Sequence, residues 1–129
     1  MSKLLARAKV KFINAQNDYY RLSEDDAYAD DCCYNLQQTI EYCLKYIVEI
    51  NGENYVESHD LRAQLNKLKN MNIDLPFADD VRHLASTINS WEVETRYNDD
   101  FIALKDDIDE VIPLARKIID YCDKLITEI

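Results

Sequence analysis

The fold is decided by residues 36–61, which read LQQTIEYCLKYIVEINGENYVESHDL. Apolar residues recur at intervals of three and four along the first half of this stretch, the spacing that places them on one face of a helix. Asn51-Gly52 ends this helix, because glycine accepts the left-handed backbone that follows a helical C-terminus. Ser58 is the expected N-cap of the next helix. The stretch therefore predicts two helices joined by a loop.

The remainder of the chain also favours helices over strands. Its 129 residues include one glycine and two prolines, which is little turn-forming material for hairpins. Long helices are expected at about residues 3–22, 27–50 and 100–127, a short one after Ser58 with its seam at Leu61, Leu65 and Leu68, and one from Asp74–Pro76 toward Arg96.

These patterns predict one all-α domain over residues 1–129, an up-and-down four-helix bundle with an additional short connector helix. Pro113 lies inside the last helix, where it removes a backbone hydrogen bond, so we expect a bend there or a division into two helices. The strict alternation of three and four in that helix also suits a coiled-coil-like partner, although a bundle core is the favoured use.

Charge and cysteine content restrict the functions open to the chain. Its 25 acidic and 15 basic residues give a net charge of −10, which argues against a broad nucleic-acid-binding face but leaves room for a small basic pocket. The acidic runs are expected on solvated helix faces and at helix starts. The four cysteines form no CxxC motif, and neither a secretory signal nor a run of transmembrane length is seen. We expect reduced thiols, a cytoplasmic location and no membrane contact.

Polar residues follow the edge of the apolar stripe on the second helix. Gln37, Glu41 and Lys45 occupy positions i, i+4 and i+8, so they share one edge, and Glu41 before Lys45 is a favourable ion-pair order. Two interpretations remain open. The edge either holds structural hydrogen bonds between helices, or it forms a polar groove in which Lys45 and Arg96 supply positive charge for a phosphate or nucleotide.

His59 has a similar pair of interpretations. It sits beside Ser58, where the positive end of the helix dipole disfavours an imidazolium. It either fastens the connector helix to the bundle or lines one pocket with Asp60 and Arg96. A metal site is not expected, because His59, Asp60, His83 and the cysteines lack a recognised metal-ligand spacing. No cofactor is expected either.

Tyrosine is the remaining compositional signal. Nine tyrosines exceed what so small a core buries, and half-buried tyrosine is typical of interfaces. This predicts a homodimer or partner surface along the second helix. Trp91 fits the apolar seam of the fourth helix and is expected in the core.

Several of these residues together resemble the HEPN family, small helical bundles often encoded beside minimal nucleotidyltransferases. The resemblance covers most of the chain and rests on Gln37-Gln38, Glu41, Lys45, Gly52, His59-Asp60-Leu61 and Arg96-Tyr97, in this order and at these spacings. Members usually carry Lys where Tyr42 stands and Pro where Asn98 stands. The resemblance implies that ligand or partner binding involves Gln37, Glu41, Lys45, His59, Asp60, Arg96 and Tyr97.

The resemblance also defines what is missing. HEPN ribonucleases use an Arg followed, after four to six intervening residues, by a His, paired across a dimer. Here neither His59 nor His83 follows an arginine at that interval. We therefore predict no catalytic residues and a non-catalytic, dimeric interaction module that binds a nucleotidyltransferase-like partner or a nucleotide in a toxin–antitoxin or defence setting. The alternatives are a divergent ribonuclease or nucleotide-processing enzyme using His59, Asp60 and Arg96, or a purely structural bundle.

Overall fold

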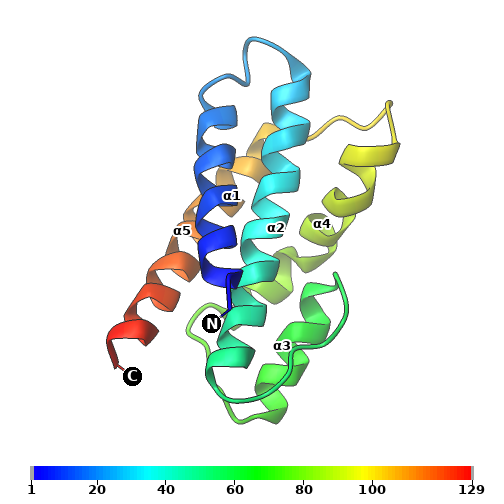
Figure 1. Cartoon of the computed structure of the whole chain (residues 1–129). Coiled ribbons are helices and arrows are strands. Elements are labelled where there is room, and N and C mark those ends of the chain that lie inside the picture. Colours follow the sequence, from blue (N-terminus) through cyan, green and yellow to red (C-terminus); the bar gives the residue numbers. More distant parts are fainter. Residues whose placement is uncertain (1, 129) are drawn as a thin grey trace.

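The chain folds into an arrangement of helices without strands in the part that the computed structural model describes, residues 2–128, with side chains to residue 125. The helices are α1 (Leu4–Tyr19), α2 (Asp26–Ile50), α3 (Leu61–Asn70), α4 (Ala78–Tyr97) and α5 (Lys105–Glu128). Figure 1 shows α1, α2, α4 and α5 as the long helices, with the short α3 below α4. The all-α prediction is confirmed.

Helix α2 is the central element. The Asp25 carboxylate accepts a hydrogen bond from the Ala27 N–H at 2.8 Å and begins the helix, and Gly52 follows its end with φ +87°. α2 packs against α1, α3, α4 and α5, α1 packs also on α5, and α4 packs also on α3 and α5. The apolar seam residues of α2, Leu36, Ile40 and Ile47, are completely buried. The predicted bundle with a connector helix is therefore confirmed.

The start of α3 corrects one prediction, because Asp60 rather than Ser58 is its N-cap. The Asp60 carboxylate accepts from the Arg62 N–H at 2.9 Å, whereas Ser58 Oγ accepts from the Asp60 N–H at 3.0 Å. Gln64 explains the shift. Its buried side chain donates to the carbonyls of Val56 and Ser58 at 2.7 and 3.2 Å, so the loop stays out of the helix until Leu61.

The ends of α5 and α1 also differ from the apolar pattern. α5 begins at Lys105 rather than near Asp100, because Asn98 has an extended backbone and a turn follows it. α1 ends at Tyr19 rather than Leu22. α5 continues through Pro113 as one helix, so of the two expected outcomes, a bend or a division into two helices, the division does not occur. Proline removes one backbone hydrogen bond inside a helix, and the 24-residue helix continues on both sides of it.

The cysteines and aromatic residues behave largely as their positions predicted. All four cysteines are free and buried, and burial raises the pKa of the Cys32 thiol to about 12, which keeps it protonated. Trp91 is buried in the core. Of the tyrosines, all within the described chain, Tyr20 and Tyr97 are exposed and the others half-buried. Between residues 2 and 128, we find no helix whose length and apolar character would let it cross a membrane.

Candidate functional site

Glu41 lies at the centre of a buried polar group on α2. Gln37 Nε2 donates to its carboxylate at 2.8 Å from one turn before, and Lys45 Nζ donates at 3.1 Å from one turn after. Gln38 Nε2 in turn donates to Gln37 Oε1 at 2.7 Å. The Glu41 side chain is only 2% exposed and that of Lys45 10%. The i, i+4 spacing thus gives a buried carboxylate whose charge a buried ammonium compensates.

His59 joins this group from the loop before α3. Its Nδ1 atom lies 3.0 Å from Glu41 Oε1, while 66% of its side chain remains exposed. The Lys45 ammonium also lies over the ring of Tyr55, 4.8 Å from its centroid, so the same loop covers this end of α2. We call Gln37, Glu41, Lys45 and His59 the Glu41 cluster.

Asp60 follows His59 but faces another helix. Asn89 Nδ2 on α4 donates to Asp60 Oδ1 at 2.8 Å, and Asn89 Oδ1 accepts from the Leu61 N–H at 3.0 Å. Asn89 therefore holds both the cap and the first residue of α3. Sequence reasoning missed Asn89, because an asparagine between seam residues of an amphipathic helix carries no signal of its partner.

Arg96 and Tyr97 form a second group at the end of α4. Arg96 Nη1 donates to Glu92 at 2.6 Å and Nη2 to the Tyr97 hydroxyl at 2.8 Å. The guanidinium also lies over the rings of Tyr34 and Tyr97, 5.6 and 5.0 Å from their centroids. We call Tyr34, Glu92, Arg96 and Tyr97 the Arg96 cluster. Opposite charges at i, i+4 could have indicated the Glu92–Arg96 pair, whereas nothing in the sequence linked Tyr34 on the second helix to Arg96.

The two clusters lie along the same pair of packed helices. On α2, Tyr34 precedes Glu41 by seven residues, which places the two on one face about 10 Å apart along the axis. On α4, Asn89, Glu92 and Arg96 share a face by the same spacing rule. α2 packs directly on α4. We call the Glu41 cluster, the Arg96 cluster and Asn89 together the α2–α4 seam, a name distinct from the apolar seams of the single helices.

The predicted site residues thus separate into groups within the seam. Gln37, Glu41, Lys45 and His59 are brought together, as are Arg96 and Tyr97. Among the described residues, no hydrogen bond or ion pair connects Arg96 to His59 or Asp60. A single pocket formed by these three residues therefore stays a hypothesis.

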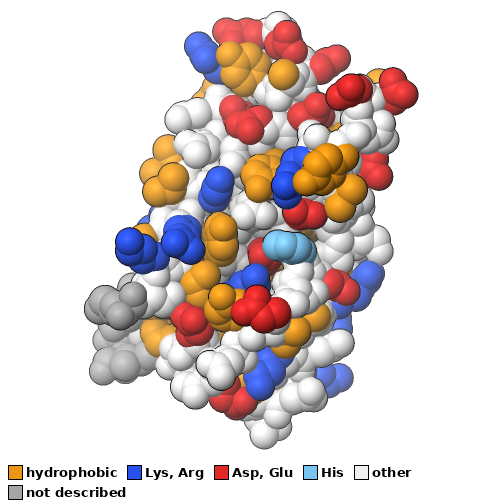
Figure 2. All heavy atoms as spheres, turned by 45° about the vertical axis from the view of Figure 1, so that its right-hand side comes forward, with side chains coloured by type: hydrophobic (Ala, Val, Ile, Leu, Met, Phe, Trp, Pro, Cys, Tyr) orange, Lys and Arg blue, Asp and Glu red, His pale blue; other side chains and the backbone are white. Residues whose placement is uncertain are grey.

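The electrostatics of the seam disfavour a free anion. Lys45 is paired with Glu41 and Arg96 with Glu92. Arg96 also lines an open cavity of about 500 Å³, whose other lining residues are Ala27, Asp30, Asp31, Tyr34 and Thr95. Burial and the neighbouring Asp26 raise the pKa of Asp30. Figure 2 shows basic, acidic and apolar side chains interleaved on this side, with acids gathered toward the upper end. A phosphate would meet carboxylates beside each cation.

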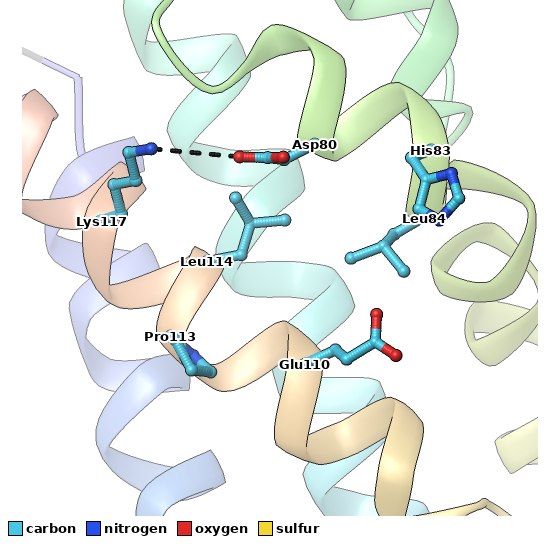
Figure 3. Close-up of a pocket in the computed structure, with 7 residues that line it drawn as sticks. All are labelled: Asp80, His83, Leu84, Glu110, Pro113, Leu114 and Lys117. Atoms are coloured by element: carbon cyan, nitrogen blue, oxygen red, sulfur yellow. Dashed lines mark ion pairs between the residues drawn. The ribbon is translucent and has the colours of Figure 1, made fainter.

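His83 lies apart from the seam contacts. It is an exposed residue of α4 that lines a cavity of about 340 Å³ between α4 and α5 with Leu84, Glu110 and Pro113 (Figure 3). Asp80 and Lys117, at the other end of this cavity, lie 3.9 Å apart. Within residues 2–128, no group of three His, Cys, Asp or Glu side chains is arranged to hold a metal ion.

Comparison with known proteins decides the family. The model of the HEPN domain family matches residues 1–125, almost the whole chain. The chain belongs to the HEPN family. This confirms the resemblance to the family, and it agrees with the helical architecture described above.

One solved structure extends the comparison of this HEPN chain to three dimensions. The crystal structure of TT1696 from Thermus thermophilus is similar to it with a TM-score of 0.64 and 22% sequence identity, over 96% of this chain and 98% of that one. At this identity the likeness concerns the fold alone. No curated protein matches the chain.

Proposed function

We propose that this HEPN protein is a non-catalytic interaction module that binds a partner protein through the α2–α4 seam. The observation that carries the proposal is the neutralisation of both seam cations. Glu41 compensates Lys45 at 3.1 Å, and Glu92 compensates Arg96 at 2.6 Å. By the family relationship we expect a dimer whose partner is nucleotidyltransferase-like, acting in a toxin–antitoxin or defence setting in the cytoplasm.

Neutralised cations favour a protein partner over a nucleotide. A phosphate at Lys45 would compete with Glu41, whose carboxylate side chain is only 2% exposed. Breaking such a buried pair is costly, because it leaves a charge uncompensated. The Arg96 cluster instead offers an arginine that contacts two tyrosine rings, and arginine and tyrosine are among the residue types most enriched at the energetic centres of protein interfaces.

The first test is binding by variants that alter the seam but keep the fold. We expect Arg96→Ala and His59→Ala to weaken the complex with a minimal nucleotidyltransferase encoded by the adjacent gene, measured by calorimetry on purified proteins. Arg62→Ala is the matched control, since Arg62 is an exposed arginine of α3 that bonds Ser86. Unchanged binding in both seam variants contradicts the proposal, as does the absence of such a neighbouring gene.

Two further measurements test the oligomeric state and the class of ligand. Light scattering is expected to show a dimer, and a clean monomer at tens of micromolar contradicts that part of the proposal. Titration with ATP is expected to give no heat of binding at the seam. ATP binding that Arg96→Ala removes would instead establish the nucleotide as the ligand.

A divergent ribonuclease is the second candidate, and one observation favours it. The buried Glu41 carboxylate holds His59 by Nδ1 at 3.0 Å, and most of the ring faces solvent. A carboxylate that orients an accessible imidazole is the arrangement of a histidine general base. RNA cleavage by the purified protein, lost in His59→Ala and in Arg96→Ala, would place this candidate first.

A further inference from the structure

The end of α4 and the segment that follows carry a group of exposed apolar side chains. Val93 and Tyr97, one turn apart on α4, are 52% and 70% exposed, and Ile102 and Leu104 in the next segment are 74% and 63% exposed. We call these four residues the distal apolar patch. All four fall within residues 93–104, and exposed large apolar side chains that form a patch mark interaction sites more often than isolated ones do.

Inward and outward side chains alternate in the segment after α4, so the fold itself determines that Ile102 and Leu104 are exposed. Phe101 and Ala103 pack against the core, whereas Ile102 and Leu104 between and after them point away from it. A segment with no helical structure alternates in this way when it is extended. Phe101 and Ala103 therefore fix the segment on the bundle, and the outward residues contribute nothing to that anchoring.

The charge around the patch is strongly negative. Residues 92–107 contain six acidic and two basic residues, and the two bases, Arg96 and Lys105, are already paired with Glu92 and Asp109. In Figure 2 acidic side chains gather at the end of the molecule where, in Figure 1, α1 turns into α2 and α4 ends. Asp30 and Asp31 line the cavity beside Arg96 at this same end.

The combination selects the kind of partner. A symmetric contact with a second copy would place this acidic surface against itself, which electrostatic repulsion opposes. A purely cationic ligand would leave the apolar side chains in water. A segment that carries basic residues on one face and apolar residues on another matches both the negative charge and the exposed apolar side chains. Its lysines or arginines pair with the carboxylates while its apolar face covers the patch.

We propose that the distal apolar patch and the acidic residues around it dock a basic, amphipathic helical segment of a different protein. This builds on the proposed function by giving the chemistry of the partner's docking segment. Tyr97 belongs to both the patch and the Arg96 cluster, so the docked segment is predicted to begin at the α2–α4 seam and to extend a partner's contacts to Val93, Ile102 and Leu104.

The experiment uses the full-length protein and three synthetic peptides of equal length in fluorescence anisotropy. One is an amphipathic Leu/Lys helix, one is its Leu/Glu counterpart, and one is oligolysine. The Leu/Lys peptide is expected to bind about tenfold more tightly than oligolysine, which corresponds to the apolar contribution. The Leu/Glu peptide is expected not to bind. Equal affinity for the Leu/Lys peptide and oligolysine overturns the proposal, because attraction to a protein of net charge −10 then accounts for the binding.

Paired variants locate the peptide on the surface. Tyr97→Ser with Ile102→Ser, and separately Asp99→Asn with Asp100→Asn, are each expected to weaken Leu/Lys peptide binding about tenfold. The matched apolar control is Val10→Ser with Ile13→Ser, two residues of α1 that are each 55% exposed, and the matched charge control is Asp74→Asn with Asp79→Asn. Equal losses in the test and control variants overturn the proposal.

The outcomes remain distinct from those of the proposed function. The Leu/Lys peptide assay does not depend on the nucleotidyltransferase, so its failure removes the docking segment and leaves the seam proposal standing. Conversely, peptide binding that requires Tyr97 and Ile102, together with nucleotidyltransferase binding indifferent to Arg96→Ala and His59→Ala, keeps the docking surface and removes the seam.

Discussion

His59 Nδ1 lies 3.0 Å from Glu41 Oε1, although the histidine side chain is 66% exposed and the glutamate side chain only 2% exposed. The same carboxylate accepts from Lys45 at 3.1 Å. Glu41 therefore connects the interior of α2 to a surface loop. A change at Glu41 affects both the buried charge balance and the orientation of His59, whereas a change at His59 leaves the Glu41–Lys45 pair in place.

This asymmetry predicts unequal losses of stability. Glu41→Ala leaves the Lys45 ammonium buried without a compensating charge, which is expected to lower the free energy of unfolding by about 3 kcal/mol. His59→Ala removes a mostly exposed partner and is expected to cost less than about 1 kcal/mol. Urea unfolding followed by circular dichroism measures both. Similar losses in the two variants would show that the buried pair does not dominate.

A paired replacement checks the physical reason. Glu41→Leu with Lys45→Met removes both charges and keeps apolar volume in the core, so it is expected to be more stable than Glu41→Ala by about 1–3 kcal/mol. If the paired variant is as unstable as Glu41→Ala, the loss comes from packing or from the bond to Gln37 rather than from an uncompensated charge.

The cap of α3 predicts a contrast between two neighbouring residues. Asp60→Ala removes the bond to the Arg62 N–H and the bond from Asn89, and it is expected to cost about 1–2 kcal/mol. Ser58→Ala removes one bond in an exposed turn and is expected to cost about 0.5 kcal/mol or less. Asp60→Asn, which keeps an N-cap oxygen, is the control. A larger loss for Ser58→Ala than for Asp60→Ala contradicts the assignment of the cap.

The same region shows how far sequence reasoning reached. Gln37, Glu41 and Lys45 were predicted to share an edge because one helix determines their spacing, and the structure places them together. The contact between His59 and Glu41 depends on the path of the loop between the helices, which the buried Gln64 side chain fixes. No local periodicity encodes such a contact, so sequence reasoning offered a fastening role for His59 as one of two interpretations but did not identify Glu41 as its partner.

Helix ends show a similar division. Apolar spacing predicted the existence of each helix, but it extended α5 back over Phe101, which packs on the core from an irregular segment. An apolar residue predicts burial, but it does not by itself predict whether the buried residue lies in a helix or in an extended segment. Asn89 was missed for a related reason. Its contact with Asp60 joins residues 29 positions apart, and local spacing does not report such a contact.

Asp18 predicts a pH dependence of stability. Burial, together with a hydrogen bond and charge repulsion from Asp31, raises the pKa of the Asp18 carboxyl from 3.8 to about 7. Asn35 Nδ2 donates to both carboxylates, at 3.2 and 3.1 Å. The folded protein binds this proton more tightly than the unfolded chain does. The resulting stabilisation is complete below pH 3.8 and is lost as the pH rises to about 7.

Asp18→Asn tests this sign directly. At pH 8 the variant is expected to be more stable than the parent by about 1 kcal/mol, allowing for solvent screening. At pH 5 the difference is expected to be smaller but not zero, because the unfolded chain is already ionised above pH 3.8 while the folded Asp18 still holds its proton. Melting temperatures at both pH values measure the difference. Asp99→Asn, at an exposed position, is the control and is expected to change little at either pH. An equal shift for Asp18→Asn at pH 5 and pH 8 would exclude the titration.

Pro113 predicts a stabilising substitution. α5 continues through it, so the Asp109 carbonyl lacks the N–H that any other residue at this position would supply. The Pro113 side chain is exposed at the cavity between α4 and α5, so little packing is lost on its removal. Alanine is favoured over proline inside a helix by about 3 kcal/mol, against which the freer unfolded chain costs about 1 kcal/mol.

We therefore expect Pro113→Ala to raise the free energy of unfolding by about 1–2 kcal/mol and the melting temperature by a few degrees. Thermal unfolding of the two proteins in parallel measures the change, with Glu110→Ala as a control for substitution at the same cavity. A lower melting temperature for Pro113→Ala means that the proline ring is part of the packing between α4 and α5, and that this contact outweighs the missing backbone hydrogen bond.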